Sequence, residues 1–216
     1  MTQNVTNRDR QKEQSRRLVL EAAANAFANH GYDGASMGAI AQDAGLSKAS
    51  VLYHFESKQA LWEATVDDVF GRAIDSLMAK VTRSSAPGGT PPLAALIDAF
   101  VAVCQENRPY VLIPIVEGIK DSPRTDYIAR KHLVGHSAAF RRFLEQSLGQ
   151  PVSAEMALHL QNVVAGGAQL YIGLAPLWTS ALERDTTEAK SLDEFRAFIT
   201  QTFSTRFPGL EALLTS

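Results

Sequence analysis

The sequence predicts an all-α protein of about nine helices, because apolar residues recur three and four positions apart along nearly the whole chain. Alternating runs bounded by turn residues, the pattern of strands, are missing. The chain has 216 residues, 45% of them hydrophobic, which is enough for a sizeable core. A small N-terminal group of three helices is followed by a larger helical region. We therefore expect two domains.

The first helix is predicted from an apolar stripe that runs from Leu18 to Phe27 and stops at Gly31. Before it, residues 1–15 are expected to be a flexible basic arm. Residues 8–17 carry five basic side chains against two acidic ones. Such a segment can supply phosphate contacts to a nucleic acid, or it can simply be a solvated, frayed end. Both interpretations stay open.

Two short helices follow, and they are joined by a tight turn. Ser36 can cap the first of them, whose apolar face contains Met37 and Ile40. Gly45 permits a sharp turn, and Ser47 can cap a second helix that runs to about Phe55. This arrangement is a helix-turn-helix, in which the second helix enters the major groove of DNA.

The second short helix has one apolar and one polar side. Val51 and Phe55 are expected to face the core together with Leu46. The outward residues suit DNA, because hydroxyl, ammonium, phenol and imidazole groups can bond to base edges or phosphates. These candidates are Ser47, Lys48, Ser50, Tyr53 and His54, with Lys58 at the start of the next helix. The alternative is an ordinary surface helix in a helical hairpin.

The longest periodic segment, at about 58–82, predicts an uninterrupted helix of six turns. It ends in the sequence RSSAPGGTPP, the clearest break in the chain. Further helices are expected at about 93–106, 109–120, 124–148, 153–179 and 191–206. Pro114 should kink or break its helix, and Ser191 with Glu194 has the pattern of a capping box at the start of the last one.

The run from Arg16 to Trp62 resembles the DNA-binding domain of the TetR/AcrR family of bacterial transcriptional repressors. The resemblance is carried by AAANAFANHGYDGASMGAIAQDAG and LSKASVLYHFESKQALW. It implies a DNA-binding domain at 16–60 and a ligand-binding and dimerisation domain at 61–216. It also adds Ser36 to the DNA contacts. Two positions depart from the family pattern: Ala49 is a mild change from the usual glycine or other small residue and keeps close approach possible, and Leu52 lacks the hydrogen-bond donor often found at its position.

The same resemblance assigns the helices at 153–179 and 191–206 to a four-helix bundle across a two-fold homodimer, although these faces could instead pack within one subunit. The predicted interface residues are Met156, Leu160, Val163, Val164, Gly167, Tyr171, Phe195, Phe198 and Ile199. A pocket for a small hydrophobic effector is expected between the helices at 58–82, 93–106 and 124–148, because aromatic walls with a few polar groups are typical of ligand sites. Its candidates are Phe70, Ile74, Phe100, Cys104, Tyr110, His136, Phe140 and Trp178, each of which is also suited to ordinary core packing.

Several classes of function are disfavoured. There is no glycine-rich phosphate loop, no GxSxG motif and no nucleophile with an evident partner, so we expect no enzyme activity and no cofactor. His132 and His136 are four residues apart but lack further ligands at metal-binding spacing, which favours core or solvent-facing histidines. A single cysteine, Cys104, and the absence of a long apolar segment indicate a soluble cytoplasmic protein.

We therefore expect a homodimeric repressor that binds a palindromic operator and is released when a small hydrophobic effector binds. One alternative is a related DNA binder that activates transcription or acts without a ligand. The other is a helical small-molecule-binding protein that no longer binds DNA.

Overall fold

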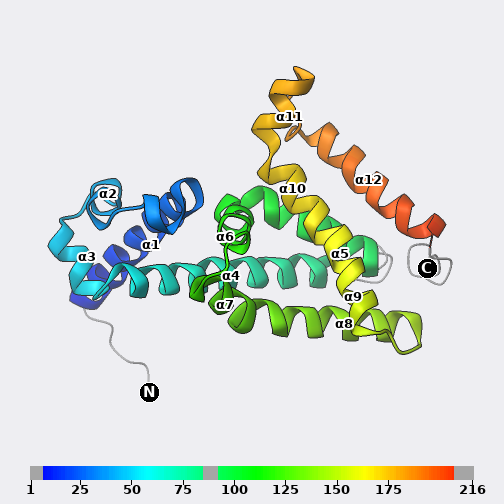
Figure 1. Ribbon diagram of the computed structural model, residues 1–216, viewed down its shortest axis with the longest axis horizontal. Coiled ribbons are helices and arrows are strands. Elements are labelled where there is room, and N and C mark those ends of the chain that lie inside the picture. The colour runs from blue at the N-terminus through cyan, green and yellow to red at the C-terminus, as the bar shows by residue number, and fades with distance from the viewer. Residues whose placement is uncertain (1–6, 85–91, 207–216) are drawn as a thin grey trace.

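The computed structural model describes residues 7–84 and 92–206, and within them every regular element is helical, as predicted (Figure 1). The first four helices are α1 (Asn7–Gly34), α2 (Met37–Asp43), α3 (Lys48–His54) and α4 (Lys58–Ser84). The next group comprises α5 (Pro92–Glu106), α6 (Arg108–Gly118), α7 (Pro123–Ile128), the π-helical turn η1 (Ala129–Leu133) and α8 (Val134–Leu148). The last comprises α9 (Ala154–Gln161), the π-helical turn η2 (Asn162–Gly166), α10 (Gly167–Gly173), α11 (Ala175–Leu182) and α12 (Ala189–Arg206).

The N-terminal helices α1, α2 and α3 pack together at one end of the molecule, around buried residues such as Val19, Phe27, Ile40 and Val51. Helix α1 already begins at Asn7, so residues 7–15 of the predicted flexible arm are helical, whereas residues 1–6 lie outside the described part. The regular part of α1 ends at Gly31, as predicted, because its backbone turns there to φ 66° and ψ 178°.

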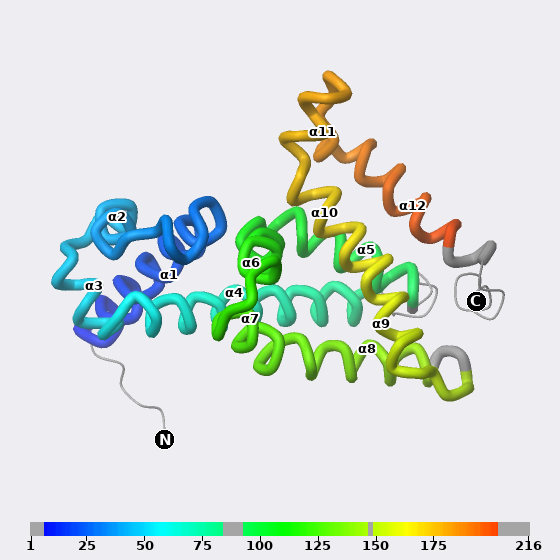
Figure 2. The backbone as a smooth tube through the Cα atoms, in the orientation of Figure 1, coloured from blue at the N-terminus to red at the C-terminus, as the bar shows by residue number. Residues whose placement is uncertain are grey.

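Helix α4 leaves this domain and continues without a break along the larger domain (Figure 2). Helix α5 packs beside α4, and α6 packs against both α1 and α4. Helices α10 and α12 cover α5, with α12 at the end of the molecule away from α1–α3. One apolar core therefore extends from Val19 in α1 to Ile172 in α10, and a second cluster around Leu93, Leu144 and Ile199 lies further out.

Two expectations about helix boundaries are wrong, and at Pro114, where a kink or a break was expected, the break does not occur. Helix α6 continues through Pro114 instead of breaking, because a proline removes only one backbone bond and the buried Val111 and Ile113 hold the helix on the core. Ser191 is not a helix cap: α12 starts at Ala189, and the buried Ser191 hydroxyl donates to the carbonyl oxygen of Asp185 at 3.3 Å.

The helix expected at 153–179 is also divided. It passes through the π-helical turn η2, and it is interrupted at Leu174. Pro176 at the start of α11 lacks the N–H that would continue the ladder of hydrogen bonds, which accounts for the interruption.

Candidate nucleic-acid interface

The helix-turn-helix is fixed by serine side chains at its helix starts. The Ser36 Oγ accepts a hydrogen bond from the Ala39 backbone N–H at 3.1 Å, and the Ser47 Oγ accepts one from that of Ser50, also at 3.1 Å. Between them, Gly45 adopts φ +67°, the left-handed region that favours glycine. The two capped helices and the glycine turn are therefore as predicted.

Helix α3 has the two faces that its sequence predicts. Val51 and Phe55 are buried, and Leu46 packs against the same core. On the other side, Lys48 is exposed and 69% of the Tyr53 side chain is accessible to solvent. Both groups are thus free to meet a macromolecule lying along α3. The Ser47 and Ser50 hydroxyl oxygens lie 2.9 Å apart, so one of the two hydroxyls donates a hydrogen bond to the other.

The first turns of α1 lie against the C-terminal half of α3. The Ser15 Oγ and the His54 Nε2 are 2.8 Å apart, and the Lys12 ammonium lies 5.5 Å from the centre of the Tyr53 ring. Burial lowers the pKa of His54, and the nearby Lys12 and Arg16 lower it further. His54 is therefore half-buried and hydrogen-bonded to Ser15 of α1, and its ring does not point fully into solvent as predicted.

Lys12, Ser15 and Arg16 were not among the predicted site residues. The excess of basic residues at 8–17 pointed to this segment, but nothing in the sequence indicated that it would form a helix in contact with Tyr53, His54 and Phe55. The Arg16 guanidinium lies 5.4 Å from the Phe55 ring centre. This segment therefore adds positive charge beside α3.

Lys58, predicted to contact phosphate, is turned toward the last turn of α1. Its ammonium lies 4.5 Å from the Tyr32 ring centre and donates to the Asp33 carbonyl oxygen at 3.4 Å. The preceding Ser57 caps α4 by accepting from the Ala60 N–H at 3.0 Å. Of the two departures from the family pattern, Ala49 is exposed, and so is Leu52, with 44% of its surface accessible.

The residues predicted to line an effector pocket separate into two groups. Around Phe70, ring centres lie 5.2 Å away at Tyr110 and 6.5 Å away at His136, and Phe100 lies 6.3 Å from Tyr110. Cys104 is fully buried near Tyr110, and burial raises the pKa of its thiol to about 12. Ile74 is half-buried on α4. Phe140 instead stacks on Phe143 in the outer cluster, and Trp178 is exposed on α11, so these two do not join the group around Phe70.

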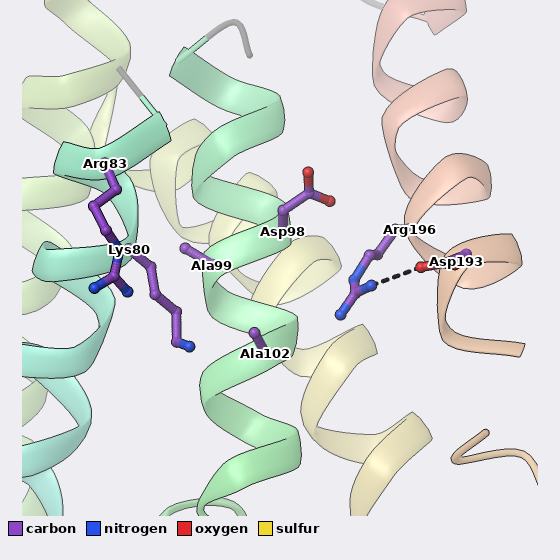
Figure 3. Close-up of a pocket in the computed structure, with 7 residues that line it drawn as sticks. All are labelled: Lys80, Arg83, Asp98, Ala99, Ala102, Asp193 and Arg196. Atoms are coloured by element: carbon purple, nitrogen blue, oxygen red, sulfur yellow. Dashed lines mark hydrogen bonds and ion pairs between the residues drawn. The ribbon is translucent and has the colours of Figure 1, made fainter. Parts of the chain in front are cut away.

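A separate hollow of about 510 Å³ opens between α4, α5 and α12 (Figure 3). Its lining is Lys80, Arg83, Asp98, Ala99, Ala102, Asp193 and Arg196. Lys80 pairs with Glu106 at 2.7 Å and Arg196 with Asp193 at 2.7 Å. Burial raises the pKa of Asp98, and the nearby Asp193 acts in the same direction against Arg196. This hollow is charged and does not suit a hydrophobic effector.

The residues predicted for the dimer interface are also divided. Leu160, Val164 and Ile199 are buried within the subunit and pack in the outer cluster, so they do not face solvent. The Tyr171 ring stacks on the Phe195 ring, with 4.4 Å between ring centres. A Cβ on Gly167 would lie 3.8 Å from both Phe195 and Ile199. Tyr171, Gly167 and Phe195 therefore lie at the contact between α10 and α12. Met156, Val163 and Phe198 remain exposed.

Further exposed apolar residues continue the same face and were missed. They are Leu170, Leu174, Leu177 and Leu182, on α10, α11 and the connection between them. The positions 156, 163, 170 and 177 recur every seven residues, with 174 between the last two. That spacing marks part of the exposed set, but Leu158, which is 52% exposed on α9, falls outside it, so the spacing alone does not separate outer from inner residues.

The histidines on η1 and α8 form part of a polar and aromatic contact with α4. The His132 Nε2 lies 2.9 Å from an Asp67 oxygen, and its ring stacks on Phe70 at 4.6 Å. Burial lowers the pKa of both His132 and His136. In the part of the chain that the structure describes, no three metal-binding side chains gather at one point. In the same residues, no helix has the length and apolar character needed to cross a membrane.

The fold and this interface define a helix-turn-helix protein with a larger all-α domain. Residues 19–65 match the model of the family described as bacterial regulatory proteins, tetR family. The biofilm operon icaADBC negative transcriptional regulator IcaR is 31% identical over 67 residues in Staphylococcus aureus and 30% identical over 60 residues in Staphylococcus epidermidis. These matches cover 31% and 28% of this chain, and the chain spans about a third of the length of these curated relatives, 36% and 32%.

Solved structures are similar over most of the chain. A TetR-like transcriptional regulator from a Rhodococcus species has a TM-score of 0.61 at 16% identity, covering 89% of this chain and 97% of the other. The fatty acid degradation regulator FadR from Bacillus halodurans has a TM-score of 0.61 at 14% identity, covering 85% and 93%. The resemblance seen in the sequence is confirmed: residues 19–65 match the tetR family, and the chain shares its fold, over 89% of its length, with a TetR-like regulator.

Proposed function

We propose that this protein is a homodimeric transcriptional regulator, most simply a repressor, that binds a palindromic operator and is released by a small hydrophobic effector. The observation that supports it most is helix α3. A capped helix within a TetR-family domain presents Lys48 and Tyr53 to solvent, while Val51 and Phe55 anchor it from behind. Lys48 would bond a guanine or a phosphate, and Tyr53 a phosphate.

The homodimer is supported by the exposed apolar face of α9–α12. Leu177 is 57% and Phe198 64% accessible in the single chain. Contiguous apolar surface on a soluble protein is a common mark of an interface. A two-fold pairing of this face would present two α3 helices to the two halves of a palindrome.

The effector is proposed to bind at the aromatic group around Phe70, where Tyr110 and His136 supply polar atoms among apolar walls. Because α4 carries Phe70 and continues from the helix-turn-helix, a shift of α4 would move α3. The IcaR relatives are negative regulators by name, which favours repression for this chain as well. An activator, or a regulator that acts without a ligand, would use the same interface.

The test begins with selection of duplexes by the purified protein from a random pool, followed by binding measurements against random competitor DNA over a salt series. We expect a palindromic consensus, competitor-resistant binding in dimer units, and release by some members of a panel of apolar compounds. Binding that random duplex abolishes would contradict the proposal. In cells, deletion of the gene should raise transcription from the operator-containing promoter, whereas a fall would identify an activator.

A further inference from the structure

A buried carboxylate lies where the two domains meet. Glu117, near the end of α6, is 1% exposed. One of its oxygens accepts a hydrogen bond from the backbone N–H of Tyr32 at 3.2 Å, and the other accepts from the Arg124 Nε at 3.0 Å. Tyr32 belongs to the DNA-binding domain, whereas Glu117 and Arg124 belong to the larger domain. The Glu117 side chain therefore joins the two domains, and Lys120 lies beside it, with its ammonium 3.7 Å from the Glu117 carboxylate and 3.6 Å from that of Asp33.

Arg124 closes this contact from the other side. Its guanidinium lies 4.0 Å from the Tyr32 ring centre. The same group therefore binds Glu117 and covers the Tyr32 ring at the same time. On its own side, the Tyr32 ring contacts Phe27 and Trp62, at 6.1 and 6.4 Å between ring centres. The three residues Tyr32, Glu117 and Arg124, which we term the Tyr32 clamp, thus form a closed set of contacts.

The backbone geometry brings α6 close to this point. Gly31 has a positive φ, and a Cβ placed on it would lie 3.3 Å from the Val116 Cγ1. The α6–α7 turn is also held: the Thr125 hydroxyl lies 2.8 Å from the carbonyl oxygen of Glu117 and 2.7 Å from that of Lys120. The clamp is therefore held in the larger domain by the hydrogen-bonded α6–α7 turn and contacts the last turn of α1.

Burial makes these contacts sensitive to small changes. A buried charge is tolerated only when it is paired and hydrogen-bonded, and removing one partner is costly. An exposed ion pair such as Arg130–Asp126 has no comparable constraint. Tyr32 lies in the last turn of α1, four residues before the Ser36 cap of α2, so a contact that holds Tyr32 lies close to the start of the helix-turn-helix.

We infer that Glu117 is a positioning residue for DNA binding: through the Tyr32 clamp it fixes the orientation of the helix-turn-helix, and thereby the separation of operator half-sites that the dimer accepts. The inference rests on the proposed function. Glu117 itself does not contact DNA. Its loss should therefore act on the geometry of binding and leave the chemistry of base recognition in place.

The test compares Glu117→Gln with Glu145→Gln. Glu145 is a matched control, because it accepts from an arginine Nε (Arg141, 3.1 Å) and a backbone N–H (Val152, 3.3 Å) but lies at the α8–α9 turn. Affinity is measured for the duplex selected by the wild type and for duplexes with a spacer one base pair shorter or longer. Arg124→Lys, which keeps the charge but loses the planar cover on Tyr32, is a second variant in case Glu117→Gln does not fold.

For Glu117→Gln we expect roughly tenfold weaker binding to the selected duplex, which corresponds to about 1.4 kcal/mol, and a reduced preference among spacers. Glu145→Gln should retain the wild-type preference. A general loss of folded protein would weaken binding to every spacer equally, so an unchanged preference in both Glu117→Gln and Arg124→Lys overturns the inference.

Hydrogen exchange of the Tyr32 amide separates this inference from the proposed function. Exchange should be faster in Glu117→Gln than in the wild type and unchanged in Glu145→Gln. If the wild type selects no duplex, the proposed function fails, and the positioning role fails with it. If the wild type selects a duplex but Tyr32 exchanges equally in all three proteins, only the clamp is overturned.

Discussion

Helix α3 and the segment from α9 to α11 are both two-faced, but their outer faces differ in kind. The outer face of α3 is polar, with Lys48 and Ser47 in solvent, and needs no partner to be stable in water. The outer face of α9–α11 is apolar, with Val163, Leu170 and Leu177 exposed. A polar surface is well solvated in the free protein and can bind a partner reversibly. An apolar surface lowers the free energy of the protein most when it stays buried. This difference agrees with the proposed function, in which α3 binds DNA reversibly and the α9–α11 face is buried in a lasting dimer.

The largest effect is expected from placing charge on the apolar face. In Leu170→Asp/Leu177→Asp, two carboxylates would have to be buried in the proposed interface, so the dimer should dissociate. Loss of the linked second half-site should weaken operator binding by roughly 100- to 10,000-fold. Sedimentation and binding to the selected duplex measure the two consequences.

The control for this change is Val134→Asp, which alters another exposed apolar residue, at the start of α8. It should leave both the mass in solution and the affinity unchanged. If the double variant stays a dimer, then the apolar face of α10 and α11 is not the dimer interface. The proposed difference between a reversibly bound α3 face and a permanently buried α9–α11 face would then be wrong.

The second largest effect is expected from a change on the polar outer face of α3. Lys48→Ala should weaken binding to the selected duplex by about 1–3 kcal/mol and relax discrimination at one base position if Lys48 contacts a base. If it contacts only phosphate, selected and random duplexes should weaken alike, and the salt slope should fall by about one. The matched control is the exposed Lys190 on α12. Equal affinities of wild type and Lys48→Ala would remove Lys48 from the interface.

A third, smaller effect compares serine caps in the two regions. Ser47 caps α3, and Ser153 caps α9 by accepting from the Met156 N–H at 3.1 Å. Replacing either with alanine should cost about 1 kcal/mol of unfolding free energy, measured by thermal or denaturant unfolding. Only Ser47→Ala should also weaken DNA binding. An equal loss of DNA binding in Ser153→Ala would show that the DNA measurement merely follows stability.

How far the sequence could predict the molecule also differs between the two regions. In the helix-turn-helix, local chemistry decides the structure: Ser36, Gly45 and Ser47 each have one local role, and the structure has them in those roles. In α9–α12, Leu160 and Val163 are both apolar and three residues apart, yet one is buried and the other exposed. That distinction depends on where α5 and α12 pack, which periodicity alone does not specify.

Contacts between distant segments were the other part that the sequence could not supply. The pairing of Ser15 with His54 and of Tyr32 with Glu117 joins residues far apart in the chain. No local pattern marks such pairs, because each residue type is common on helix surfaces. The basic residues near the N-terminus allowed either phosphate contacts or a solvated, frayed end, and did not predict the helix that carries them.

The smallest expected effect is a pH dependence that comes from His54. Burial, with Lys12 and Arg16 nearby, holds its pKa below the ordinary value of 6.5 in the free protein, so the ring is neutral at neutral pH. Phosphates beside α3 would favour the protonated ring and raise its pKa in the complex. Binding should then take up a proton, and the affinity should rise as the pH falls through 6.5, by at most about tenfold per pH unit.

Folding stability should change in the opposite direction. Because the pKa of His54 is lower in the folded than in the unfolded chain, its contribution to stability is complete above pH 6.5 and is lost as the pH falls through the folded pKa. Fluorescence anisotropy from about pH 8 to about pH 6 with wild type and His54→Gln isolates the effect, since His132 and His136 are present in both. Parallel pH profiles would mean that His54 stays neutral on DNA, held by Ser15 as a support for α3 and not as a phosphate contact.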